Sequence, residues 1–396
     1  MKKTHTAHLS LIIGTLLMLL DQFFWTSHAK HIHISKVNTL MSTLQVQHII
    51  TLLGLDLVII SLGYIYSKRE NSLSEAIKTW LYTIFTGFIA TIICFFLTKE
   101  IDTNAVYSIF LPIIRNVSPV ITGLILSLIC YPFMKKVNYK YLKFILLALL
   151  LIPTLGGTDL LGLNDGYSIP FTFILFYLGV IEASEEKRFS IISLILLCLI
   201  NVLCVTMMPL CSKIVHGDMS TALRFTTSTS FMEVMIACLL VRLLRNIPFF
   251  NNWTSIRYIP LASLVLIGAD RLKTIVSWNE DLVGKSAEKL FRQGVVEAVV
   301  IILVVLLVTI LLKQLPQVKE LQHALDEHFR DFELTDQWIQ KEVHFIFDFL
   351  KAHRINIIML IVAYILSYAS FIAMNTAYTI EINAIETYNI FWYTLF

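Results

Sequence analysis

The chain ends on the aromatic stretch FWYTLF, residues 391–396, in which Tyr393 is the side chain best suited to covalent chemistry. A phenol has a reference pKa of about 10, so it becomes a nucleophile only beside a base or in a polarising environment. An ester on a phenol is more activated than an ester on an alkyl alcohol, so it could pass its acyl group to a sugar hydroxyl. The other interpretation is an aromatic belt that anchors the end of a membrane span.

Histidines in the segment SHAKHIHIS are the candidate bases for such chemistry. His31 and His33 alternate and share a face if the segment is extended. An imidazole is half-ionised near neutral pH, so either ring could take up a proton. Three histidines close together, His28 included, without a distant fourth ligand match a zinc site poorly, so no metal and no bound cofactor are expected. The alternative is a set of solvated loop histidines.

Ionisable residues also occur inside or beside apolar segments, where they usually face a cavity or a partner because their burial in lipid is costly. Asp21 and Asp56 fall within the first two apolar segments, and Arg115 just precedes the fourth. We expect these three side chains to line a central tunnel, with a structural polar network as the alternative. Glu233 and Glu297 lie near the ends of their segments, where they can face solvent.

The composition indicates what must position these residues. Hydrophobic residues make up 57% of the 396, charged residues 15%, and the net charge of +3 gives no indication of a nucleic-acid partner. Apolar segments of about 20 residues can cross a bilayer, and in lipid they must be helices, because backbone polar groups have no other partners. The sequence therefore predicts an all-α polytopic membrane protein with about eleven spans, at 9–27, 49–66, 77–98, 117–134, 142–157, 168–183, 189–210, 229–247, 256–272, 294–313 and 355–378.

The distribution of basic residues predicts the orientation. With the N-terminus inside the cell, the inner segments carry 20 of the 31 lysine and arginine residues. This asymmetry follows the positive-inside rule. The start MKK, followed by an apolar run without a small-residue cleavage site, is typical of a retained signal anchor. An odd number of spans then places the C-terminal tail outside.

The charged stretch that begins at Pro316 differs from the rest of the chain. It spaces Leu321, Leu325 and Phe329 at helical intervals, which predicts a cytoplasmic amphipathic helix at the lipid interface. The expected organisation is a ten-span membrane core over 1–315, this linker helix over 316–354, and a final span with its tail over 355–396.

Several motifs resemble the acyltransferase-3 family, in its Gram-positive exopolysaccharide and cell-wall O-acyltransferase form. The second segment ends in Ser61-Leu62-Gly63-Tyr64, the fourth is entered through Pro112 to Asn116, and it exits through Tyr131-Pro132-Phe133. The stretch NDGYSIPFTFILFYLGVIEA resembles a later span of the same family. The likeness covers about residues 5–313. It implies a ten-helix core that acylates envelope polymers, with Tyr64, Arg115 and Asn116 along the substrate tunnel.

The chain departs from this family at its catalytic positions. Leu11 stands where the family has an arginine, Asp21-Gln22 where it has histidine, and Ala269 or Asp270 where a late span has another histidine. Either the chemistry has moved to other residues or the core has lost it. The catalytic candidates are therefore Tyr393, His31, His33 and Asp21.

The tail carries a second resemblance, to the small membrane protein of the teichoic-acid D-alanylation system. That protein has one span and an outside C-terminus ending Phe-x-Tyr-x-x-Phe, matched by Phe391, Tyr393 and Phe396. The resemblance implies that Tyr393 is an acyl carrier.

Together these features predict an O-acyltransferase of the bacterial plasma membrane. It would move an acetyl or D-alanyl group from acetyl-CoA or a carrier-protein thioester inside to a polysaccharide or teichoic acid outside. Expected partners are the lipid bilayer, the acyl donor or its carrier protein, and an extracytoplasmic acyltransferase or the polymer acceptor. The alternatives are a non-catalytic scaffold of an envelope-assembly complex and a transporter of a lipid-linked sugar.

Overall fold

The part of the chain that the computed structural model describes is helical and holds no strand, so the all-α expectation is confirmed for these residues. The structure describes residues 7–28, 39–69, 71–99, 118–156, 168–185, 190–200, 229–245, 247, 254–268, 271–272, 287–328, 352 and 355. The elements are α1 (His8–His28), α2 (Thr39–Tyr66), α3 (Ser72–Thr98), α5 (Pro119–Met134), α6 (Tyr139–Gly156), α7 (Ile169–Ser184), an apolar helix over Ile191–Ile200, α9 (Phe231–Leu244), the 3-10 helix η3 (Thr254–Arg257), α10 (Tyr258–Ile267), α12 (Ala287–Gln314) and α13 (Pro316–His328).

Each of the first ten apolar segments predicted from the sequence contains a described helix. The last predicted segment, 355–378, lies almost entirely outside the described residues. Three helices begin five or more residues earlier than the apolar pattern indicates, since α2 starts at Thr39, α3 at Ser72 and α12 at Ala287. Their added first turns contain Leu, Met, Gln, Ala, Glu and Lys, which have good helix propensity whether or not they are apolar.

Local capping explains where two helices begin. The Asn71 side chain accepts a hydrogen bond from the Ser74 backbone N–H at 3.1 Å, which caps α3. The Ser168 hydroxyl accepts from the Phe171 N–H at 3.2 Å and caps α7. Such caps satisfy donors that have no partner within the first turn.

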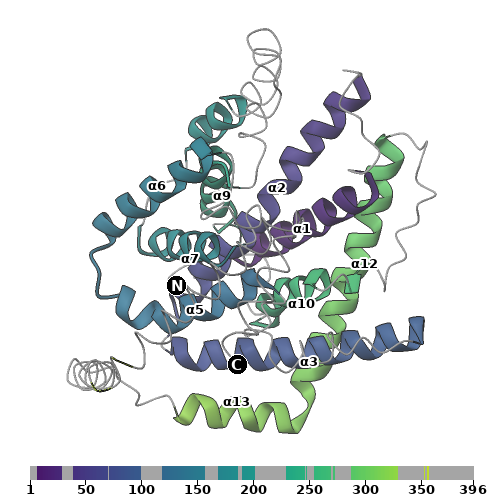
Figure 1. Cartoon of the computed structure of the whole chain (residues 1–396), viewed down its shortest axis with the longest axis vertical. Coiled ribbons are helices and arrows are strands. Elements are labelled where there is room, and N and C mark those ends of the chain that lie inside the picture. The colour runs from purple at the N-terminus through teal and green to yellow at the C-terminus, as the bar shows by residue number, and fades with distance from the viewer. Residues whose placement is uncertain are drawn as a thin grey trace. The chain divides into compact units, whose positions relative to one another are not determined.

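Helix α2 lies among α1, α7 and α9 and contacts all three (Figure 1). It runs antiparallel to α1, because the Ser10 and Ser61 hydroxyls hydrogen-bond at 2.7 Å while Thr51 donates to Asp21 at 3.0 Å. The middle of the helix, from Leu57 to Ser61, is fully buried. Residues on α2 are therefore positioned by helices on several sides.

Glycines allow α2 and α7 to approach closely. A Cβ atom built on Gly63 would lie 2.1 Å from the Phe176 carbonyl oxygen, and one on Gly179 would lie 2.1 Å from the Ile60 carbonyl oxygen. Contact of this kind, with small residues at the crossing, is frequent between membrane helices. On the other side of α7, the Tyr177 hydroxyl donates to the Ser127 carbonyl of α5 at 2.8 Å.

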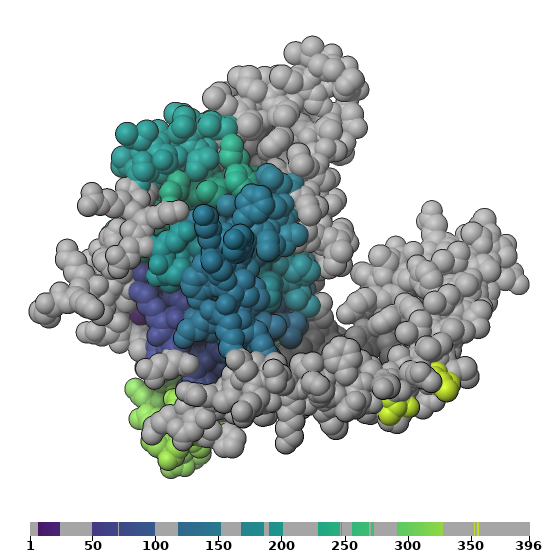
Figure 2. All heavy atoms as spheres, turned by 90° about the vertical axis from the view of Figure 1, so that its left-hand side faces the viewer, coloured from purple at the N-terminus to yellow at the C-terminus, as the bar shows by residue number. Residues whose placement is uncertain are grey.

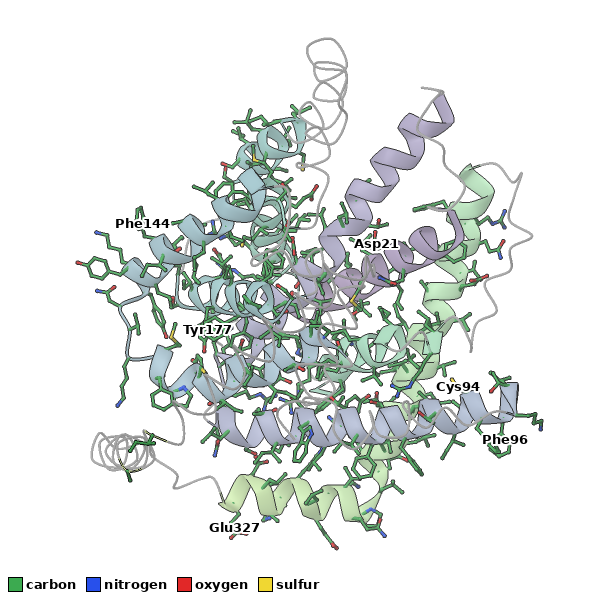
Figure 3. The ribbon with its side chains drawn as sticks, in the orientation of Figure 1. Asp21, Cys94, Phe96, Phe144, Tyr177 and Glu327 are labelled. Atoms are coloured by element: carbon green, nitrogen blue, oxygen red, sulfur yellow. The ribbon has the colours of Figure 1, made fainter. Side chains whose placement is uncertain are left out.

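Several helices expose apolar faces. Phe96 on α3 is 65% exposed and Phe144 on α6 is 75% exposed, and Figure 3 shows both pointing away from the neighbouring helices. Residues 118–151, in blue, form much of the face turned toward the viewer in Figure 2. Among the described residues, Ser72–Thr98 and Phe291–Gln314 are long and apolar enough to cross a membrane, and the other apolar helices are shorter.

The chain divides into two compact units, Met1–Asp331 and Phe332–Phe396. The first unit therefore extends beyond residue 315, the end of the membrane core expected from the sequence, and includes α13. The physical reason is that α13 contacts both α12 and α3. The second unit lies outside the described residues apart from Ala352 and Ile355.

Candidate functional site

Two acidic side chains are buried together between α2 and α9. Asp56 and Glu233 are both 0% exposed, and their carboxyl groups lie close enough to interact electrostatically. Among the described residues, neither carboxyl oxygen of Asp56 has a hydrogen-bond partner. Burying an ionised carboxylate is costly unless it is paired, so this pair is a place where a proton can be held.

The two acidic residues lie at a similar depth in the bundle. Asp56 is ten residues before Tyr66 at the end of α2, and Glu233 is nine residues before Arg242 near the end of α9. At 1.5 Å per residue, both lie roughly 15 Å from those helix ends. The pair therefore occupies the interior of the bundle and not its edge.

This geometry corrects the expectation for Glu233, which the sequence places near a segment end and so in reach of solvent. The first turn of α9 is covered by other helices, since α2, α7, α1 and α6 all contact it, and Glu233 is fully buried. Glu297, in contrast, is half-buried on α12, where the Gln293 amide donates to it at 2.9 Å. Hydropathy alone could not distinguish the two glutamates.

A second polar group gathers where the ends of α2, α3 and α10 meet. The Arg257 guanidinium lies 2.7 Å from a carboxylate oxygen of Glu75, and it donates to the Tyr258 hydroxyl at 3.1 Å. The same guanidinium lies over the ring of Tyr66, 5.7 Å from its centre, and Lys78 completes the group 3.8 Å from Glu75. A buried charge network of this kind holds three helix ends in register.

A third polar group joins the ends of α7, α9 and α2. Arg242 makes two parallel hydrogen bonds to the Glu182 carboxylate, and Arg245 donates to the Glu182 carbonyl at 2.9 Å. Arg245 also lies over the ring of Tyr64, whose hydroxyl accepts a hydrogen bond from Lys68 at 2.9 Å. The planar fork of arginine matches a carboxylate, which explains the bidentate pair.

If successive helices alternate in direction, the ends of α2, α7, α9 and α12 and the beginnings of α3, α6 and α10 lie at the same end of the bundle, and the polar contacts agree with this. Lys143 at the start of α6 binds Glu185 just after α7 at 2.8 Å. Lys313 at the end of α12 lies over the ring of Tyr258 at the start of α10. One end of the bundle therefore carries the ion pairs. The sequence identified many of these residues only as members of a basic surface, because the acidic partners lie far away in the chain.

Helix α13 is attached to this polar end through Asp326. The Asp326 carboxylate accepts hydrogen bonds from Lys78 and from the Ser74 hydroxyl, the latter at 2.9 Å. Burial raises the pKa of Asp326, but the hydrogen bonds from Lys78 and Ser74 outweigh it, so the pKa lies below the usual value of 3.8. The ionised form is therefore the one that holds α13 against α3.

This attachment should depend on pH. A lowered pKa contributes stability that is present above the unfolded value and is lost as the pH falls through the folded value. We expect hydrogen exchange at the α13 amides to be slow near neutral pH and faster at about pH 3, relative to α2, which serves as internal reference. Asp326→Asn should show the faster exchange already near neutral pH and little further change with acid. Equal protection in both proteins at both values would contradict the role of Asp326.

The site residues expected from the sequence are described only in part. Asp21 is buried and bonded to Thr51, Asp56 is buried near enough to Glu233 to interact electrostatically, and Tyr64 lies in the polar end, eight residues or about 12 Å along α2 from Asp56. Figure 3 shows Asp21 between α1 and α2. Tyr393, Phe391, Phe396, His31, His33, Arg115 and Asn116 lie outside the described residues.

The comparisons with known proteins give no further identification. No family model, no curated protein and no solved structure matches this chain.

Proposed function

We propose that the chain is a multi-pass protein of the bacterial plasma membrane, with its N-terminus inside and its C-terminus outside. The alternation of helix directions, the ion pairs gathered at one end of the bundle and the exposed apolar faces of α3, α6 and α12 support this placement. The polar end would be the cytoplasmic surface, because the basic residues concentrate there and the positive-inside rule favours that side.

We further propose that the protein is an O-acyltransferase, which transfers an acetyl or D-alanyl group from an inner thioester to an envelope polymer outside. The observation that carries this proposal is the buried carboxyl pair, Asp56 and Glu233, which lies roughly 15 Å from the polar end of the bundle. In the transfer, the carbon–sulfur bond of the thioester breaks, a carbon–oxygen bond to a hydroxyl forms, and the hydroxyl proton ends on the thiol. A buried carboxyl group can receive that proton from the base beside the hydroxyl and pass it to the departing thiolate without water entering.

Each remaining candidate has a separate place in this scheme. Tyr393 would hold the acyl group as an aryl ester on the outer side and release it to a polymer hydroxyl, which restores the phenol. His31 or His33 would take the phenolic proton there, and Asp21 would assist on the path between the two surfaces. The donor, acetyl-CoA or a carrier-protein thioester, would approach the polar end, and Arg115 and Asn116 would face the passing group.

The test is mass spectrometry of the C-terminal peptide from purified full-length protein, in search of an acyl adduct on Tyr393. We expect the adduct in the wild type and its loss in Tyr393→Phe, together with a large reduction in envelope acylation, because phenylalanine keeps the aromatic anchor and removes the nucleophile. Trp392→Phe is the matched control, since it changes a neighbouring aromatic residue and keeps the phenol. Unchanged envelope acylation in Tyr393→Phe would exclude the carrier role.

A second candidate, a transporter of a lipid-linked sugar, is favoured by the same buried carboxyl groups, since intramembrane acids often relay protons in transporters. Transport and acyl transfer can be distinguished by what appears outside the membrane. Transport would leave Tyr393 unmodified, and Asp56→Asn would reduce the appearance of the lipid-linked sugar outside without changing the acylation of polymer already present there.

A further inference from the structure

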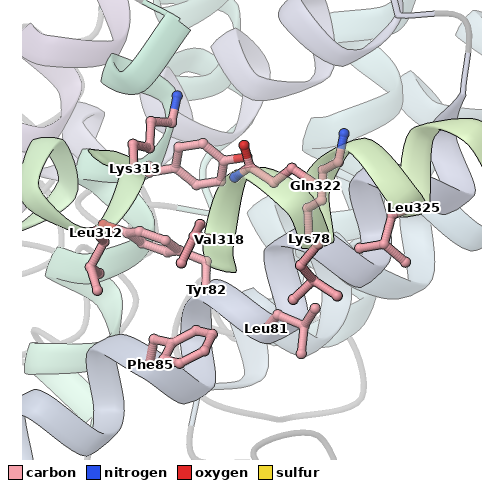
Figure 4. Close-up of a pocket in the computed structure, with 11 residues that line it drawn as sticks. Lys78, Leu81, Tyr82, Phe85, Leu312, Lys313, Val318, Gln322 and Leu325 are labelled. Atoms are coloured by element: carbon pink, nitrogen blue, oxygen red, sulfur yellow. The ribbon is translucent and has the colours of Figure 1, made fainter. Parts of the chain in front are cut away.

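A small open pocket, with a cavity volume of about 40 Å³, lies at the polar end of the first unit between α3, α10, α12 and α13 (Figure 4). The helix α3 contributes Lys78, Leu81 and Phe85, α12 contributes Lys313, and α13 covers the pocket with Leu321 and Leu325. The scheme of acyl transfer above uses none of these six side chains. Its lining combines two cations with a mostly apolar wall.

The two cations lie at the same level of the bundle. The start of α3 and the end of α12 both lie at the polar end, so the two helices run antiparallel here, and the Tyr82 and Thr309 hydroxyls hydrogen-bond at 2.5 Å. Lys78 and Lys313 each lie four residues from these hydroxyls toward the polar end, and Figure 4 shows both ammonium groups on the same side of the pocket, with Gln322 between them in this view. The charged groups at this end of the pocket are four cations, Arg69, Lys78, Arg257 and Lys313, and two acids, Glu75 and Asp326, of which Asp326 accepts a hydrogen bond from Lys78. This end of the pocket therefore has a positive potential that favours an anion.

The other end of the pocket is apolar and continues onto an exposed surface. Phe85 lies one turn beyond Tyr82, on the side away from the cations, and is partly exposed. It begins a stripe of exposed side chains at helical spacing, which Phe88, Ile92 and Phe96 continue along α3. A chain leaving the pocket past Phe85 would thus remain on an apolar path nearly to the end of α3.

We propose that this pocket binds an anionic phospholipid of the inner leaflet, with its phosphate beside Lys78 and Lys313 and an acyl chain along Leu81 and Phe85. The inference rests on the proposed membrane placement, which puts the cations at the depth of the lipid head groups and Phe85 deeper in the hydrocarbon. A phospholipid carries its phosphate and its acyl chains in one molecule, so the phosphate can lie at the cationic end of the pocket while a chain lies at the apolar end. Helix α13 would lie over the head group, held in place by Asp326, so that lipid binding and α13 docking stabilise each other.

The test uses the purified full-length protein in a neutral detergent, with phosphatidylglycerol and phosphatidylcholine of identical acyl chains as probes. Native mass spectrometry measures the dissociation constants, and the unfolding midpoint measures the stabilisation. We expect phosphatidylglycerol to bind more tightly and to raise the midpoint more than phosphatidylcholine does. In Lys313→Gln the affinity for phosphatidylglycerol should fall about fivefold, the effect of one basic residue facing an anionic lipid.

Lys319→Gln is the matched control, since Lys319 is exposed on α13, outside the pocket lining, and has the same charge. It should leave the affinity unchanged. If Lys313→Gln does not fold, Phe85→Ser gives an independent test at the apolar end. It should weaken long-chain phosphatidylglycerol more than a short-chain form, because only the long chain reaches that residue.

Three outcomes would overturn the proposal: equal affinity for the two lipids, equal effects of Lys313→Gln and Lys319→Gln, or complete displacement of the lipid by inorganic phosphate, which would indicate a site for the free anion. Failure of the proposed function has different signatures. Extraction of the protein from membranes by alkaline carbonate would refute the membrane placement, and absence of an adduct on Tyr393 would refute acyl transfer while leaving lipid binding intact.

Discussion

Asp56→Asn should reduce envelope acylation by about 10²-fold to 10⁴-fold, the usual contribution of a positioned acid or base. Asparagine keeps the size of the side chain and cannot exchange a proton. Because Asp56 is fully buried and its carboxyl oxygens have no partner among the described residues, the substitution removes no hydrogen bond that is seen there. The unfolding midpoint should therefore stay the same or rise while activity falls.

The partner of Asp56 provides a second measurement. Glu233→Gln should reduce acylation by a similar factor, and the double variant should lose little more than either single variant, since residues that act as a unit are not additive. Acylation is measured as ester released from isolated cell envelopes, normalised to the amount of membrane protein. Two independent losses that multiply would show that the two carboxyl groups act separately.

Comparing Asp21→Asn with Asp56→Asn distinguishes a role in proton transfer from a structural role of these acidic residues. Asp21 accepts a hydrogen bond from Thr51, so its substitution alters a polar contact between α1 and α2. If Asp21→Asn and Asp56→Asn both retain full acylation at normal expression, the acidic residues of the bundle are structural and the proton-transfer role is refuted.

Gly179→Ala should strongly destabilise the first unit. The added methyl group would meet the Ile60 carbonyl oxygen at 2.1 Å, and the backbone of a buried helix cannot move aside without disturbing its other contacts. We expect a loss of about 3 kcal/mol in the free energy of unfolding, at the upper end of overpacking effects. The measurement is reversible unfolding in mixed micelles, followed by tryptophan fluorescence.

Gly294→Ala is the matched control for this prediction. A Cβ atom there would meet the ring of Phe23 at 2.7 Å and the side chain of Leu20 at 3.2 Å, and these are side-chain atoms rather than a backbone carbonyl. Alanine is also better than glycine within a helix by about 1 kcal/mol, which offsets part of the cost of shifting the buried Phe23 ring. The substitution at Gly294 should therefore cost clearly less than Gly179→Ala. Equal losses at the two positions would show that the α2–α7 crossing is not uniquely tight.

The helices themselves could be predicted from the sequence, because they depend on information that is local in the chain. Long apolar segments and the turn residues between them indicate where helices such as α3 and α7 lie, and a single pattern of hydropathy suffices. The same pattern gave Asp56 as an unusual residue, since a carboxyl group inside an apolar segment is conspicuous without any structure. The aromatic tail and the histidine segment were also identified from the sequence, and their roles remain predictions.

Only the tertiary structure decided which residues meet. Glu233 became a partner of Asp56 because other helices cover the first turn of α9, and nothing in its own segment distinguishes it from Glu297. The pair of Arg257 with Glu75, and the joining of Asp326 to Lys78, likewise connect positions from different helices. Hydropathy indicates where a residue lies along its own helix. Its neighbours on other helices are set by the rotation and crossing angle of each helix. These depend on close contacts such as the one between Gly63 and Phe176.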